Sequence, residues 1–107
     1  MNEIKIAVTA PDAFDARVQM QKIITEISNN VSKYNAIMAE IDTHHRTLRG
    51  GQHGFGASAA ASLANAAARL AQVDGRIAAL AEIGNLLLGT KAVEHLLAGG
   101  EVTLTAG

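Results

Sequence analysis

A glycine-rich break decides the fold: RGGQHGFG, residues 49–56. Four of its last seven residues are glycine, and each glycine costs about 1 kcal/mol relative to alanine in a helix interior. Long helical patterns lie on both sides of this break. We therefore expect helices at residues 12–48 and 58–88, joined by a tip loop at residues 49–57.

The first helical pattern carries apolar residues alternately four and three positions apart over about four heptads. Pro11 suits a first helical turn, and Asp12 and Asp15 favour the positive end of the helix dipole. The sustained spacing of about 3.5 residues predicts a coiled-coil seam. The seam residues are Met20, Ile24, Ile27, Val31, Tyr34, Met38, Ile41, His45 and Leu48.

The second helical pattern has the same spacing but is rich in small residues. Ser58 is suited to cap this helix, because its hydroxyl can accept a hydrogen bond from a first-turn N–H. The many alanines, with Gly75 and Gly84, allow another backbone to approach closely. The seam residues are Leu63, Ala66, Leu70, Val73, Ile77, Leu80, Gly84 and Leu87.

Short segments with alternating polar and apolar residues lie near both ends of the chain. This period of two predicts a strand at residues 3–9, ended by Pro11, and another at residues 101–105. A final short helix is expected at residues 91–98, stopped by Gly99.

These elements predict a mainly α fold: a long antiparallel helical hairpin, coiled-coil-like, with short terminal β-strands. Two helices that share one seam bury little apolar area, and a two-stranded sheet is marginal in water. We therefore expect an oligomeric bundle, with the chain as a homo-oligomer. Large apolar residues remain for outward faces, namely Ile23, Ile37, Ile83, Leu86 and Leu88.

Composition excludes several classes of protein. The chain has 107 residues, 49% of them hydrophobic, which fits a single domain over residues 1–107. It has no cysteine, which rules out disulfide frameworks and thiolate metal sites. A net charge of -1 gives no basic field for duplex DNA. Because no export signal and no long uninterrupted apolar span is evident, we expect a cytoplasmic protein that does not enter a membrane.

The tip segment concentrates side chains that can bind an anion. Arg46 and Arg49 share a helix face, and glycine-rich backbone before a helix start offers free N–H groups. His53 or Phe55 can stack on a base. The candidate ligand-binding residues are Arg46, Arg49, Gly50, Gly51, Gln52, His53, Gly54, Phe55, Gly56 and Ser58. The plainer interpretation is a glycine turn joining two helices, with the arginines favouring the negative end of the first helix.

A metal site near the tip is a weaker alternative. Asp42 and His45 are three residues apart, and Glu40 and His44 are four apart, so each pair shares a helix face. His53 would be the third ligand. No fixed ligand pattern is present, so we predict neither a bound metal nor another cofactor.

The function expected from these observations is non-enzymatic: an oligomeric helical protein that acts through protein–protein interaction or assembly. Ser58 and Ser62 have no evident base and acid partners, and the carboxylates are spread singly, so we predict no catalytic residue. The alternative is a small anion- or nucleotide-binding module that sequesters or senses a phosphorylated small molecule at the tip loop.

Two groups of proteins have a similar general character. The expected helical hairpin with a glycine turn at Gly50 and Gly51 resembles the secreted WxG-type proteins. Those proteins have a diagnostic tryptophan, and this sequence contains none. Small size, lack of cysteine and alanine-rich helices are similar to those of small phage-encoded accessory proteins. We carry over no residue roles from either group.

Overall fold

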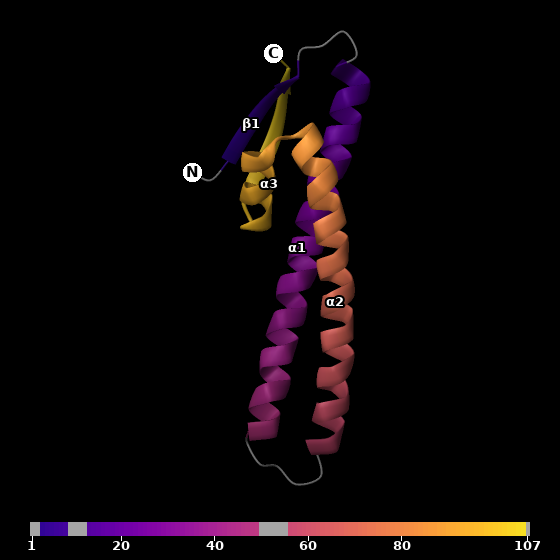
Figure 1. Ribbon diagram of the computed structural model, residues 1–107. Coiled ribbons are helices and arrows are strands. Elements are labelled where there is room, and N and C mark those ends of the chain that lie inside the picture. The colour runs from indigo at the N-terminus through magenta and orange to yellow at the C-terminus, as the bar shows by residue number, and fades with distance from the viewer. Residues whose placement is uncertain (1–2, 9–12, 50–55, 107) are drawn as a thin grey trace.

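The computed structural model describes residues 3–8, 13–49 and 56–106. Five elements follow one another: β1 (Glu3–Val8), α1 (Ala13–Arg49), α2 (Gly56–Leu87), α3 (Thr90–Leu97) and β2 (Glu101–Ala106). The molecule measures 65 × 26 × 17 Å, because α1 and α2 lie side by side along its length and run in opposite directions (Figure 1). The prediction of a mainly helical chain with two short strands is confirmed.

The long helices reach further toward the tip than predicted. α1 ends at Arg49 and α2 begins at Gly56, so the tip segment is shorter than residues 49–57. Ser58 therefore lies inside the first turn of α2 and not at its cap. The first N–H groups of a helix have no intrahelical acceptor, so the start of a helix shifts by a residue or two at little cost. The predicted start at residue 12 lies outside the described residues.

Glycines with positive φ bound α3 on both sides. Gly89 has φ of 94° and Gly99 has φ of 89°, a conformation that other residues adopt only with strain. The N–H of Gly100 donates to the carbonyl oxygen of His95 at 2.8 Å, a bond that closes the helix as in a Schellman motif. α3 starts and ends one residue earlier than the predicted range of 91–98.

β1 and β2 form a parallel two-stranded sheet, in register from Glu3 opposite Glu101 to Val8 opposite Ala106. Parallel strands need a long connection, which the three helices supply. β2 extends one residue beyond the predicted range of 101–105, while the predicted end of β1 at residue 9 lies outside the described residues. The inner face of the sheet packs against the helices through Ile4, Ile6, Val102 and Leu104.

The main core lies where α1, α2, α3 and the sheet meet. Its buried residues are Ile23, Ile24, Ile27, Val31, Ala92, Leu96 and Val102. α2 approaches closely here because residue 84 has no side chain. A Cβ at Gly84 would lie 2.8 Å from Val93 Cγ2 and 3.2 Å from Ile27 Cδ1. A smaller cluster of Ile37, Ala66 and Val73 holds α1 against α2 nearer the tip.

The face of α1 that is buried differs from the predicted seam. Ile23 and Ile37, expected to face outward, are each only 8% exposed. Met38 and His45, expected in the seam, are exposed. The reason is that α1 lies beside α2 over most of its length but meets α3 and the sheet only in its first half (Figure 1). The apolar surface of α1 is therefore wider than the seam between two helices. The spacing of apolar residues in the sequence reflects the contacts with α2 and those with α3 and the sheet together, and it does not separate them.

The end of α2 is rotated relative to its predicted seam. Leu87, predicted to be buried, is 42% exposed, whereas Leu88, predicted to face outward, packs against the main core. The N–H of Leu88 still donates to the carbonyl oxygen of Gly84 at 2.7 Å, so Leu88 lies one turn after Gly84 on the buried face that Leu80 shares, whereas Leu87 is turned away from that face by about 100°. Ile83 and Leu86 are exposed as predicted.

None of the helices, within the described part of the chain, is both long enough and apolar enough to cross a membrane.

Replacing Gly84 with alanine tests the close approach of α2. We expect Gly84→Ala to lower the free energy of unfolding by about 1–3 kcal/mol, because the new methyl overlaps Val93 in a packed core. Urea denaturation followed by circular dichroism measures this change.

Gly75→Ala is the matched control in the same helix. A Cβ at Gly75 would meet nothing within 4 Å, so this variant should gain about 0.5–1 kcal/mol from helix propensity alone. The two substitutions should change the free energy of unfolding with opposite signs; stabilisation by both would show that the packing at residue 84 is loose.

Candidate functional site

The structure describes only part of the predicted anion site. Residues 50–55 lie outside the described residues, and the backbones of Arg49 and Ser58 lie in helix ends on either side of them. The side chain of Arg46 is 73% exposed, and its Nη2 lies 2.7 Å from Asp42 Oδ2. A phosphate bound by Arg46 would therefore compete with a carboxylate that the guanidinium already has as a partner.

The residues of the alternative metal site are divided between different contacts. His44 Nε2 lies 3.4 Å from Glu40 Oε1, as their spacing predicted, whereas Asp42 contacts Arg46 and His45 is exposed. His53 lies outside the described residues. Over the described ranges, no group of three histidine or acidic side chains is placed to hold a metal ion.

An ion pair that the sequence did not predict joins the two long helices near this end. Arg69 Nη2 of α2 donates to Glu40 Oε1 of α1 at 2.7 Å, and Arg69 Nε donates to Asn65 Oδ1 at 2.8 Å. The hydrogen bond from Arg69 holds the pKa of Glu40 below its ordinary value of 4.5, with a smaller contribution from His44. Glu40 and Arg69 are 29 residues apart, so only the register of the two helices brings them together.

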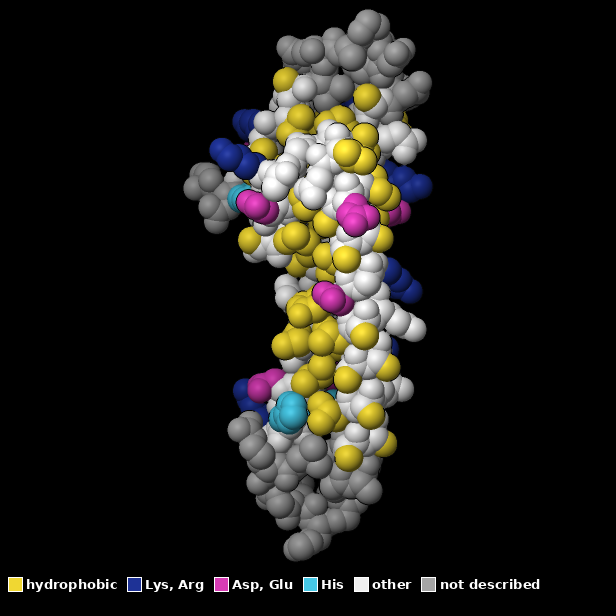
Figure 2. Space-filling model, in the orientation of Figure 1, with side chains coloured by type: hydrophobic (Ala, Val, Ile, Leu, Met, Phe, Trp, Pro, Cys, Tyr) yellow, Lys and Arg dark blue, Asp and Glu magenta, His cyan; other side chains and the backbone are white. Residues whose placement is uncertain are grey.

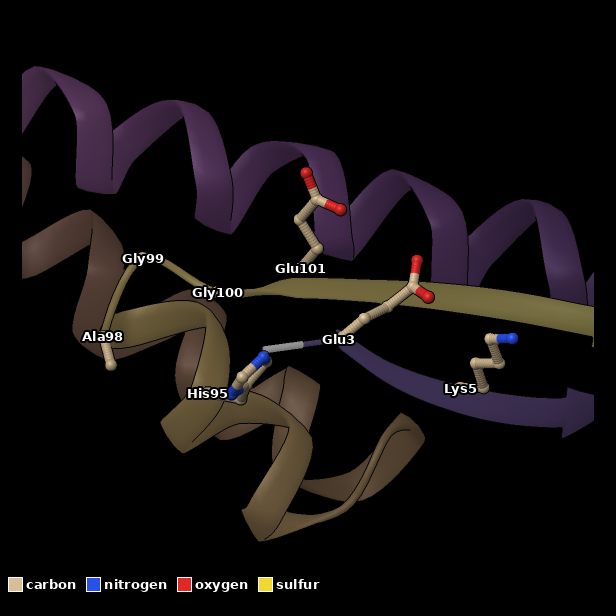
Figure 3. A pocket seen from close by; sticks show the side chains of 7 residues that line it. All are labelled: Glu3, Lys5, His95, Ala98, Gly99, Gly100 and Glu101. Atoms are coloured by element: carbon tan, nitrogen blue, oxygen red, sulfur yellow. The ribbon is translucent and has the colours of Figure 1, made fainter. Parts of the chain in front are cut away.

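A wide hollow of about 970 Å³ lies at the opposite end of the molecule, beside the start of the sheet (Figure 3). Glu3, Lys5 and Glu101 of the strands and His95 of α3 line it. The His95 ring fills the space where a side chain at Gly100 would lie, which explains why the turn into β2 needs a second glycine. The hollow is charged and open, without the enclosed apolar wall of a typical small-molecule site.

An apolar surface lies between the two long helices on the side that carries α3 and the sheet (Figure 2). We call it the distal face, made up of Tyr34, Met38 and Ile41 of α1 with Leu70 and Ile77 of α2. Met38 is 43% exposed, and the other four residues are half-buried against the smaller core cluster. The distal face continues the surface that α3 and the sheet cover nearer the base of the molecule.

A second apolar patch lies at the end of α2. Ile83, Leu86 and Leu87 are spaced three and four residues apart, so they share one face of the helix. Each is more than two-fifths exposed, and Leu86 is 89% exposed. Burial of a leucine side chain is about 1.5–3 kcal/mol more favourable than leaving it exposed to water. A patch of exposed leucine and isoleucine side chains therefore favours contact with a partner.

Comparisons with protein-family models, with curated proteins and with solved structures find no match for the chain. Two features dominate the surface of the described residues: charged groups that are mostly exposed, and apolar side chains that the described part of the fold leaves partly uncovered.

Replacing Arg69 tests the ion pair between the helices. In Arg69→Met we expect the pKa of Glu40 to rise toward 4.5, because its main hydrogen-bond donor is lost. Glu40 is deprotonated above its lowered pKa, so the stabilisation by the pair is present at neutral pH and is lost as the pH falls through that pKa. An NMR titration of the Glu40 carboxyl carbon measures the shift.

Arg76→Met removes a guanidinium from the same side of α2 and serves as the control. The pKa of Glu40 should stay unchanged in this variant, because Arg76 is not among the groups that lower it. If Arg69→Met also left the pKa unchanged, the Glu40–Arg69 contact would be absent in solution.

Proposed function

We propose that this chain is a non-enzymatic assembly protein that forms homo-oligomers, with the distal face as the contact between copies. The observation that carries the proposal is the abrupt end of the covering layer. α3 and the sheet lie against the first half of α1, and no other described element covers the same side of its second half (Figures 1 and 2).

Helical geometry shows that the covered and uncovered surfaces are one stripe. Residues seven apart lie on nearly the same face of an α-helix. Val31 is 8% exposed in the main core, and Met38, one heptad later, is 43% exposed. The side chains remain apolar while the layer that buries them stops, so the stripe is suited to contact another protein.

The chemistry of the distal face suits a helical partner. Tyrosine and methionine are enriched in the centres of protein interfaces, and methionine adapts to irregular partner surfaces. On the α2 side the exposed neighbours include the small residues Ala67, Ala71 and Ala78, together with one acid, Asp74. Small residues let a partner backbone approach, and a second copy of this helix pair would complete a four-helix bundle.

The thin shape of the molecule also favours assembly. Among the described residues of this 107-residue chain only twelve hydrophobic residues are buried, and two of those side chains are large and fully buried. Small domains with a limited core commonly gain stability from oligomerisation. A contact between copies would add the buried area that a single chain lacks.

A charge in the distal face should disrupt the assembly. We expect the wild-type protein to have a mass of at least twice the 11.1 kDa of one chain by light scattering at micromolar concentration. Met38→Glu should weaken self-association about tenfold or more, because the carboxylate would be desolvated in the interface. The measurement is the weight-average mass as a function of concentration.

Ala39→Glu is the matched control, since it adds the same charge at the next, exposed position of α1. Its mass should equal that of the wild type, and circular dichroism should show both variants equally helical. A wild-type protein that is monomeric and folded would contradict the proposed function. An oligomer unaffected by Met38→Glu would exclude the distal face as its contact.

A further inference from the structure

The outer edge of β1 is open in the described part of the chain. Over residues 3–8, 13–49 and 56–106 the sheet contains only β1 and β2, and β1 lies on the side away from the long helices (Figure 1). An edge strand presents a row of backbone N–H and C=O groups that can pair with another strand. A two-stranded sheet is marginal alone, so a further strand at this edge would stabilise it.

The sequence of β1 favours pairing, apart from its charges. It reads EIKIAV over Glu3–Val8, with β-branched residues and no proline or glycine. Ile4 and Ile6 face the core, while Glu3 and Lys5 are exposed on the outer face. A lysine on an edge strand normally discourages pairing with another strand. Here an acid lies two residues away on the same face, so an antiparallel partner strand can bring a glutamate opposite the lysine.

We propose that β1 of a second copy pairs antiparallel with this edge, in the register centred on Ile4. A two-fold axis relates the two strands, so each residue must meet one on the same face of the sheet. Centring on Ile4 places Glu3 opposite Lys5 of the other copy twice. Centring on Glu3 or on Lys5 brings like charges together, which is unfavourable, and centring on Ile6 pairs neither charge.

This pairing rests on the proposed assembly role and names a second contact for it. The residues of the distal face span seven positions on each helix, about 10 Å at 1.5 Å per residue, and two helices are roughly 20 Å wide, which gives on the order of 200 Å² per copy. A stable interface buries about 800 Å² per partner, so the distal face alone falls short. β1 lies at the other end of the molecule (Figure 1). A sheet continuous across two copies would add backbone hydrogen bonds and Ile4 contacts there.

Charge reversal tests the register. Glu3→Lys gives a copy with lysine at both positions, and Lys5→Glu gives a copy with glutamate at both. Each variant alone should self-associate through β1 about tenfold more weakly, because two attractive cross-strand pairs become repulsive. The double variant, Glu3→Lys with Lys5→Glu, should regain wild-type association. All variants carry Met38→Glu as well, so that the distal face does not mask the edge contact.

Mixing the two single variants is the decisive step. The lysine copy and the glutamate copy should form a heterodimer, detected by native mass spectrometry with one copy isotopically labelled. Glu101→Lys is the matched control: Glu101 is the register partner of Glu3 on β2, on the same exposed face but one strand away from the edge. It should self-associate like its Met38→Glu parent. Circular dichroism confirms that each variant is folded.

The outcomes separate the two proposals. If the mixture contains heterodimers and each single variant alone self-associates weakly, the result supports the edge pairing in this register. Absence of heterodimers, when Met38→Glu alone still lowers the mass of the wild type, overturns the edge pairing and leaves the distal face as the contact. Heterodimers together with no effect of Met38→Glu support the edge pairing and overturn the role of the distal face.

Discussion

The close approach of α2 to its neighbours at Gly84 is the constraint on which the rest of the fold depends. The missing side chain lets the α2 backbone pack against Ile27 of α1 and Val93 of α3 at the same point. α3 can therefore lie across both long helices, and the Gly99 turn leads directly from α3 into β2. The sheet is thus positioned by one residue that lacks a Cβ, in a part of the chain remote from either strand.

The parallel sheet adds a second constraint. Parallel strands are stable mainly where both faces are covered, yet here only the inner face is packed and the outer face carries Glu3, Lys5 and Glu101. The stability of two strands that are exposed in this way depends on the groups that pack or pair with them. On the inner side Leu96 and Ile24 of the helices supply that support. At the edge of β1, among the described residues, the fold supplies none, and this is the edge at which we propose that a second copy pairs.

Local patterns in the sequence were sufficient to predict the helices and strands, but not to predict which face of each helix is buried. The glycine break, Gly89 and Gly99 set the ends of the helices to within two residues, because backbone conformation is a local property. Met38 and Ile37 were misplaced because one helix serves two partners over half its length and one partner over the rest. The Glu40–Arg69 pair depends on register between helices, which periodicity does not encode. The candidate tip residues 50–55 lie outside the described residues.

The positions of the two open surfaces limit the kind of assembly that they would build. The distal face lies toward the tip and the edge of β1 toward the base of a molecule 65 Å long (Figure 1). A contact with two-fold symmetry joins two copies, and the same surface can then bind no further copy. Two different two-fold contacts on one subunit either close into a ring of an even number of copies or continue as an open chain. Because the surfaces are far apart on a thin rod, the tilt between the two axes decides between a closed ring of four or more copies and a filament.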